Sequence, residues 1–213
     1  MKPLLFFILL CFLVISCNRN KTGTAKLSVS KLNRNAIPAS VSYKGDIDTA
    51  IKYTDGDGDH ILIATESYAA SKGDDFHRIT GINLHAYCYR LNADKWQRMW
   101  EMTDSTDECD LDVAGGFLKK GFVITDLNQD GRGEVWLMYH LACRGNMSPD
   151  ELKIVMHEGD KKYAMHGESR VKVSVTEQNG GDYEFDAAFS NGPDVFRQYA
   201  EQLWGKNRGE KPN

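Results

Sequence analysis

The stretch Phe122-Val-Ile-Thr-Asp-Leu-Asn-Gln-Asp-Gly-Arg-Gly-Glu-Val-Trp-Leu-Met-Tyr-His-Leu141 decides the fold of this 213-residue chain. Positions 135–139 are apolar without a break, which is typical of a strand buried on both faces at the centre of a sheet. The polar segment 126–133 in front of them carries the Asp, Asn and Gly residues of a turn. The stretch therefore predicts two antiparallel strands, 122–125 and 134–141, joined by a polar loop.

The same pattern of short strands around polar turns recurs along the chain. The expected pairs are 50–54 with 60–66, 82–91 with 96–102, 152–157 with 163–166, and 171–176 with 183–189. A two-residue turn at 159–160 would place residue 157 opposite 162 and residue 166 opposite 153. The predicted fold class is mainly β, built from antiparallel hairpins. The hairpins form either a sandwich or part of a propeller, although about 170 residues are few for a closed propeller.

One helix is expected near the end of the chain. Pro193 suits a first helical position, and apolar side chains then repeat at helical spacing. These side chains are Val195, Phe196, Tyr199, Leu203 and Trp204. We expect this stripe to cover the sheet as part of the core, so residues 36–205 form a single β-rich domain and residues 206–213 a disordered tail.

Residues 1–16 look like a lipoprotein signal peptide. Lys2 precedes a twelve-residue apolar run, 4–15, which is too short to span a bilayer as a helix. The run ends in Leu13-Val-Ile-Ser-Cys17, which resembles a bacterial lipobox and implies cleavage before Cys17 and lipidation of that cysteine. An uncleaved anchor and ordinary secretion are the alternatives. By resemblance to lipoprotein sorting rules, Asn18 favours the outer membrane, on its periplasmic side or at the cell surface.

Charge is segregated along the rest of the chain. Residues 17–35 are expected to form the lipidated cysteine and a flexible tether, with five basic residues and no acidic ones. Residues 36–204 carry 17 basic and 29 acidic residues, a formal charge of −12. A body this acidic argues against nucleic acid or anionic lipid as its ligand and suits cations or neutral ligands. Simple solubility explains the charge at least as well.

Three cysteines remain after the signal peptide and the lipidated position, and an oxidising compartment favours pairing two of them. Cys88 lies in an alternating run on the same side as Leu84 and Ala86, so it is expected to be a small core residue. Cys109 and Cys143 lie in polar, loop-like segments. We therefore predict a Cys109–Cys143 disulfide and a free Cys88.

The polar loop of the opening stretch also has the pattern of a calcium site. Oxygen ligands at alternate positions, with a glycine for the sharp turn, suit a hard cation such as Ca²⁺. The candidate ligands are the side chains of Asp126, Asn128, Asp130 and Glu134 and the carbonyl of Arg132. The alternative is a hairpin in which the Asx side chains only fix the turn. The loop 55–59 has the same alternation without a closing acid, so a turn is expected there.

Motifs of the common enzyme classes are weak or missing in the sequence. Leu141-Ala-Cys-Arg-Gly145 matches four of the five residues of the caspase nucleophile signature, and His85 lies 58 residues before Cys143. The Gln of that signature is missing and the strands do not alternate with helices, which argues against a cysteine protease. The chain contains no nucleophile elbow, zincin, P-loop or dinucleotide motif.

A string of linked motifs resembles a known family. The motifs are Ile124-Thr-Asp-Leu-Asn-Gln-Asp-Gly131, Glu134-Val-Trp-Leu-Met-Tyr139, Ala142-Cys-Arg-Gly145 with Ser148-Pro149, Met156-His-Glu-Gly159 and Tyr163-Ala-Met-His-Gly167. Together they resemble Bacteroidetes lipoproteins labelled surface polysaccharide biosynthesis proteins. The resemblance implies a role in lipopolysaccharide or capsule at the cell envelope, and it carries over no catalytic residue.

Two functions are therefore expected. The first is a non-catalytic envelope lipoprotein that binds glycan or an envelope assembly protein, contacts the membrane through its lipid anchor and has no nucleic-acid partner. Tyr87 and Tyr89, on the face opposite Cys88, would stack on sugar rings if exposed, whereas ordinary strand packing would bury them. The second is a carbohydrate-active enzyme that uses carboxylates such as Asp126 and Glu134. We favour the function without catalysis.

Overall fold

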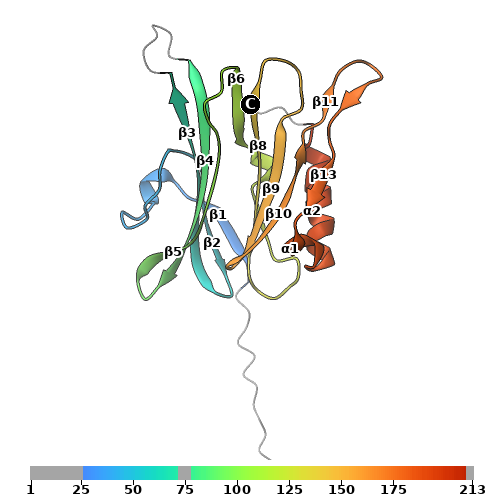
Figure 1. Cartoon of the computed structure of the whole chain (residues 1–213). Helices are drawn as coiled ribbons and strands as arrows, with labels where there is room; N and C mark the ends of the chain where they lie inside the picture. Colours follow the sequence, from blue (N-terminus) through green and yellow to red (C-terminus); the bar gives the residue numbers. More distant parts are fainter. Residues whose placement is uncertain (1–25, 72–77, 210–213) are drawn as a thin grey trace, which may run out of the picture.

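The computed structural model describes residues 26–71 and 78–209, which form two antiparallel sheets packed face to face (Figure 1). The expected signal peptide, Cys17 and the first part of the expected tether lie outside these residues. The arrangement confirms a mainly antiparallel β fold with a C-terminal helix, and it is a sandwich of two open sheets.

Sheet A has the strand order β1-β2-β3-β4-β5. Its strands are β1 (Ser28–Lys31), β2 (Asp46–Asp55), β3 (Gly58–Ala70), β4 (Ile79–Asn92) and β5 (Lys95–Thr106). Sheet B has the order β13-β10-β9-β8-β6, and β7 also pairs with β8. Its strands are β6 (Asp112–Phe117), β7 (Val123–Thr125), β8 (Glu134–Arg144), β9 (Glu151–Glu158), β10 (Lys161–Glu168) and β13 (Tyr183–Phe185).

The remaining elements are short apart from one helix. They are the helical turns η1 (Arg34–Ala36) and η2 (Lys119–Gly121), the hairpin of β11 (Val171–Lys172) and β12 (Gln178–Asn179), and the helices α1 (Ala187–Ser190) and α2 (Asp194–Asn207). α2 lies along the outer face of sheet B (Figure 1). Within the described parts of the chain, no helix is long and apolar enough to cross a membrane.

The central strand β8 is buried on both faces, as its unbroken apolar run predicts. Val135 and Leu137 point into the core between the sheets, where they join Leu62 and Leu84 of sheet A. On the opposite face, Trp136 packs beneath the helices, together with Met138, Phe196 and Leu203. α2 therefore covers the second face of β8, because a strand apolar on both sides needs a layer on each.

The outer face of sheet A is covered by the segment that connects β1 to β2. Tyr87 and Tyr89 on β4 are 1% and 3% exposed, because residues of the segment 32–47 pack across them. The Tyr89 hydroxyl donates to the Ser42 carbonyl, and the Lys44 amide donates to the Tyr87 hydroxyl at 3.2 Å. These tyrosines are therefore buried, as ordinary strand packing predicts, and are not exposed for stacking on sugar rings.

Two predicted boundaries are also wrong. β1 lies inside the expected flexible tether 17–35, where Ser28 and Lys31 lie opposite Thr54 and Ile51 of β2. At the other end, α2 continues past residue 205 to Asn207, whose side chain is buried. Both segments are ordered by tertiary contacts, which cannot be predicted from local composition.

Strand 183–189 is also shorter than expected. It ends at Phe185, because Asp186 caps α1 by accepting a hydrogen bond from the Phe189 amide at 2.8 Å. The cap directs the Phe189 side chain toward the apolar cluster under α2, where it is fully buried. The expected strand 171–176 is reduced to the two residues of β11. Its predicted pairing with 183–189 is wrong, because β11 pairs with β12 and β13 pairs with β10.

The sandwich has two chemically different ends. The turns β2–β3, β4–β5, β7–β8 and β9–β10 meet at one end, which we call the paired-loop end. The segment after β5 and the end of β8, linked by the Cys109–Cys143 disulfide, lie at the other, the disulfide end. Ser28 lies opposite Thr54, next to the β2–β3 turn, so the preceding chain enters the sandwich at the paired-loop end.

Candidate functional site

The two Asp/Gly loops contact each other at the paired-loop end. The Gly56 amide donates to the Gly131 carbonyl at 2.6 Å, and the buried Asp55 carboxylate accepts the Gly133 amide at 2.8 Å. Arg132 forms an ion pair with Asp57 at 3.3 Å. Loops that lie 71 residues apart in the sequence therefore fasten sheet A to sheet B, with Asp55 as the central acceptor.

The candidate calcium ligands Asn128, Asp130 and Arg132 lie in successive tight turns. Asn128 Oδ1 accepts the Asp130 amide at 3.1 Å, and Asp130 Oδ1 accepts the Arg132 amide at 2.8 Å. The Asn128 side-chain amide also donates to Glu158 at 2.6 Å. This is the pattern of Asx turns, the alternative interpretation of the loop.

Glu134 turns its carboxylate back onto the start of the loop. It accepts hydrogen bonds from the Thr125 hydroxyl at 2.7 Å, from the Leu127 amide at 2.9 Å and from the Asn128 amide at 3.4 Å. Burial raises the pKa of Glu134 above its ordinary value, although these hydrogen bonds act against the shift. The carboxylate is therefore committed to holding the loop against β8.

In the described segments, no group of three or more His, Cys, Asp or Glu side chains is placed to hold a metal ion. One acceptor in the loop still lacks a donor, because Asp126 Oδ1 is buried without a hydrogen-bond partner within the described chain. The carboxylates of Glu134 and Asp130 thus accept hydrogen bonds within the turn, whereas Asp126 has an oxygen that accepts none from the described residues.

A small cavity of about 20 Å³ lies beneath the paired loops, between the sheets. That volume is sufficient for roughly one water molecule. Two histidines line it. His60 stacks on Tyr53 with ring centroids 4.4 Å apart, and His157 stacks on Trp100 at 4.0 Å. Both ring nitrogens of His157 and Nδ1 of His60 are buried without a hydrogen-bond partner among residues 26–71 and 78–209.

Burial disfavours the charged form of both histidines. Burial, together with the positive charge of Lys162, lowers the pKa of His157 to about 4. Burial also lowers the pKa of His60, although Asp55, at 3.6 Å from its Nδ1, acts in the opposite direction. Sequence reasoning missed this pair. The available signal was their position, since each lies on a strand within two residues of a polar turn.

Cys88 lies in the core and is the free thiol that its alternating context predicts. Its sulfur lies 3.4 Å from the Tyr53 hydroxyl. Burial raises the pKa of the Cys88 thiol to about 12, so the sulfur stays protonated and is not an activated nucleophile.

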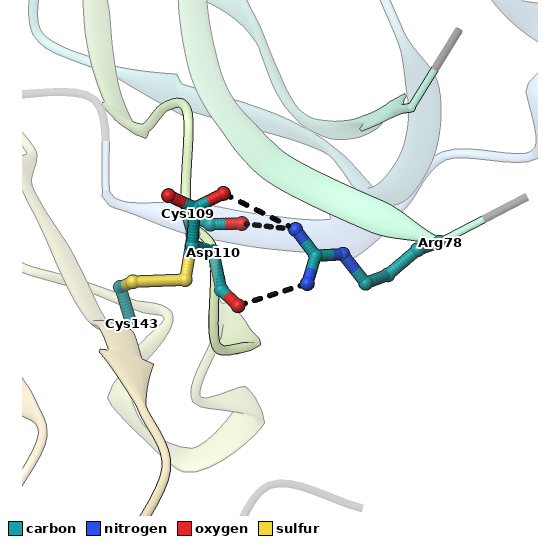
Figure 2. Close-up of a disulfide and its surroundings, with 4 residues drawn as sticks. All are labelled: Arg78, Cys109, Asp110 and Cys143. Atoms are coloured by element: carbon teal, nitrogen blue, oxygen red, sulfur yellow. Dashed lines mark hydrogen bonds and ion pairs between the residues drawn. A yellow bond between two sulfur atoms is a disulfide. The ribbon is translucent and has the colours of Figure 1, made fainter. Parts of the chain in front are cut away.

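The Cys109–Cys143 disulfide is present as predicted (Figure 2). Arg78 holds the Cys109 side of it, where its guanidinium donates to the Asp110 carbonyl at 2.8 Å and contacts the Asp110 carboxylate at 3.4 Å. With Cys143 in a disulfide, the caspase-like segment offers no thiol. His85 lies on sheet A, with its Nδ1 3.1 Å from the Thr103 hydroxyl.

Beside the disulfide, a chain of buried polar groups ends in a larger cavity. His140 Nδ1 lies 3.0 Å from Asp150, and Arg144 Nε donates to the other oxygen of Asp150 at 2.6 Å. Burial would raise the pKa of Asp150, but the hydrogen bond from His140 and the charge of Arg144 outweigh it and hold the pKa below its ordinary value. Arg144 faces an open cavity of about 480 Å³.

Comparison with protein-family models, with curated proteins and with solved structures found no match to this chain. What the arrangement can do chemically therefore follows from its own residues. At the paired-loop end, most carboxylates are used in turns and ion pairs. At the disulfide end, an open cavity has a fixed floor of polar groups.

Proposed function

We propose that this chain is an outer-membrane lipoprotein, anchored through Cys17, that supports surface polysaccharide assembly by binding glycan or an assembly partner without catalysis. The resemblance of its linked motifs to envelope lipoproteins motivates the proposal. The observation that carries it is the entry of the chain at one end of the sandwich, which leaves the cavity at the opposite end free for a ligand.

The position of Leu27 supports this anchoring geometry. Leu27 packs against the core between the sheets, one residue before β1 begins. Ten residues, 17–26, then separate the lipid from the folded body, a reach of about 35 Å at full extension. The paired-loop end would therefore lie closest to the membrane, and the disulfide end would point away from it.

The hydrogen bonds made by the acidic residues favour a binding function over a catalytic one. A glycosidase needs two carboxyl groups that face each other across a substrate cleft. Glu134 instead accepts hydrogen bonds from its own loop, and Asp126 is the only other acid assigned to the enzymatic alternative. The body charge of −12 also supports the absence of a nucleic-acid partner.

Replacing the lipidated cysteine tests the anchor. We expect Cys17→Ser to abolish incorporation of labelled palmitate and to release the protein from membranes or leave it as unprocessed precursor. Fractionation and mass spectrometry of labelled cells measure both effects, and Cys11→Ser, inside the expected signal peptide, is the matched control. A wild-type protein without label contradicts the lipoprotein assignment. The lipopolysaccharide profile of a deletion strain tests the envelope role.

Calcium binding by the loop 126–134 is a second proposal, and it rests on Asp126 Oδ1. A cation would satisfy this buried oxygen and reduce repulsion between Asp126 and Asp130. We expect Ca²⁺ at tenfold excess over its dissociation constant to raise the melting temperature by about 3–5 °C, with a much smaller effect of Mg²⁺, which dehydrates reluctantly.

The matched variants separate the calcium site from the turn. Asp130→Asn keeps an acceptor for the Arg132 amide while it removes a charge, so it should weaken the calcium response without breaking the turn. Asp160→Ala, in the neighbouring exposed turn, should leave the response intact. If calorimetry detects no heat at millimolar Ca²⁺, the loop is only a turn.

A further inference from the structure

The cavity at the disulfide end has the volume and lining of a ligand site. Its volume of about 480 Å³ falls in the range of roughly 300–1,000 Å³ that small-molecule sites occupy. It opens between the end of β8 and the segment before β6, on the side of the sandwich opposite the chain entry. Its lining includes Thr106, Leu111, Arg144, Asn146, Ser148 and Glu151.

The floor of this cavity is held in place before any ligand arrives. Arg144 donates through Nε to Asp150 and through Nη1 to the Asn146 carbonyl at 2.8 Å, so its guanidinium has one orientation. Ser148 donates through its amide and its hydroxyl to Asn146 Oδ1. The disulfide fixes Cys143, which also lines the cavity. A ligand would bind with little loss of conformational entropy in the protein.

The lining contains both polar and apolar groups. A guanidinium, a carboxylate, an amide and hydroxyls lie beside Leu111, which is 52% exposed, and Pro149. Sugars present both kinds of group as well, because hydroxyl groups exchange hydrogen bonds at the ring edge and C–H groups cover the ring face. Gly145 on the rim carries no side chain, which lets a ring approach the backbone closely.

The charge around the cavity selects against acidic ligands. The segment 107–112 carries four acidic residues and no basic one, and Glu151 adds a further carboxylate. Arg78 pairs with Asp110 and Lys153 pairs with Glu151, which leaves the carboxylates of 107, 108 and 112 without an ion pair among the described residues. Arg144, in the lining, is already paired with Asp150. Repulsion would therefore weaken binding of sulfated, phosphorylated or uronic-acid-rich glycans relative to neutral ones.

We infer that this cavity is the glycan-binding site, and that it takes neutral oligosaccharides at the end of the protein that points away from the membrane. The inference rests on the proposed function and adds to it the ligand class and the residues. It also predicts that the paired-loop end, with its water-sized cavity, takes no part in glycan binding.

Two variants block the cavity in different ways. A Cβ on Gly145 would meet only the Leu111 methyl groups among its spatial neighbours, at 3.5 and 4.0 Å, so Gly145→Trp fits and fills the cavity mouth. Leu111→Asp removes the apolar contact at a side chain that is already half exposed. Gly205→Trp, on the exposed side of α2 where an added Cβ would meet no atom within 4 Å, is the matched control.

The experiment is calorimetry on the mature full-length protein in detergent micelles. The probes are defined neutral oligosaccharides and fragments of the source strain's own lipopolysaccharide and capsule, each with an acidic counterpart. We expect neutral glycans to bind the wild type and Gly205→Trp equally, and Gly145→Trp and Leu111→Asp to bind at least tenfold more weakly. Melting temperatures near that of the wild type would show that both variants fold.

Two results would overturn the inference, and they differ from failure of the proposed function. If glycans bind both cavity variants as tightly as the wild type, the cavity is not the site, although glycan binding stands. If the wild type binds no glycan, the ligand class is wrong and a protein segment becomes the occupant to test. In either case, palmitate labelling and the lipopolysaccharide profile of the deletion strain test the proposed function independently.

Discussion

Acidification from pH 7 to pH 4 is expected to lower the free energy of unfolding by about 3 kcal/mol through His157 alone. The folded protein binds a proton on His157 only near pH 4, whereas the unfolded chain binds it with the ordinary pKa of 6.5. The contribution of neutral His157 is therefore complete above pH 6.5, is lost as the pH falls from 6.5 to about 4, and changes no further below that. His60, whose pKa is also lowered, acts in the same direction.

Urea unfolding of the wild type and of His157→Phe at pH 7, 5.5 and 4 measures this effect. Phenylalanine keeps the aromatic contact with Trp100 but cannot titrate, so the variant should lose less stability on acidification. The difference between the two proteins isolates His157 from Glu134, whose raised pKa works in the opposite direction. His166→Phe, at an exposed ring on β10, is the control. Equal pH slopes in His157→Phe and the wild type would refute the assignment.

Removal of the Cys109–Cys143 disulfide is expected to cost about 3–4 kcal/mol. The bond joins positions 34 residues apart, so it removes much of the freedom of the unfolded chain. It also fastens the segment before β6 to the end of β8, next to the cavity. The double variant Cys109→Ala/Cys143→Ala should therefore unfold at a lower urea concentration and bind neutral glycan less tightly.

A reducing agent provides the control for this prediction. Dithiothreitol should destabilise the wild type as much as the double substitution does and should leave the double variant unchanged. Cys88→Ala should keep its sensitivity to the reductant, because Cys88 is free. A double variant that dithiothreitol still destabilises would place the redox-sensitive bond elsewhere.

Much of the fold could be predicted because hairpins are local. The two-residue turn at 159–160 fixes the pairing of β9 with β10, and Lys162 lies opposite His157 as the sequence predicts. The unbroken apolar run of β8 predicts a strand covered on both sides, and the helical stripe that ends in Trp204 supplies the second cover. In each case the information lies within about twenty residues of chain.

The paired-loop end could not be predicted, because its contacts join distant segments. Asp55 belongs to a turn that fits an ordinary hairpin, and nothing local indicates that its carboxylate accepts the Gly133 amide of the other sheet. The same holds for Tyr87, whose burial depends on a preceding segment without a regular pattern. The candidate ligands of the calcium loop lie in a turn, as their Asx and Gly content predicts, but the use of Glu134 depends on backbone amides that only the fold brings within reach.

The entry of the chain through β1 determines how the protein would carry mechanical load. Tension on an anchor before Ser28 pulls along the axis of β1, away from the paired-loop end, while the chain continues from Lys31 in the opposite direction. The hydrogen bonds between β1 and β2 are then loaded together in shear, instead of being opened one after another as in a peeled strand. If the proposed lipid anchor is present, this strand of four residues would transmit the tension on the anchor to the folded body.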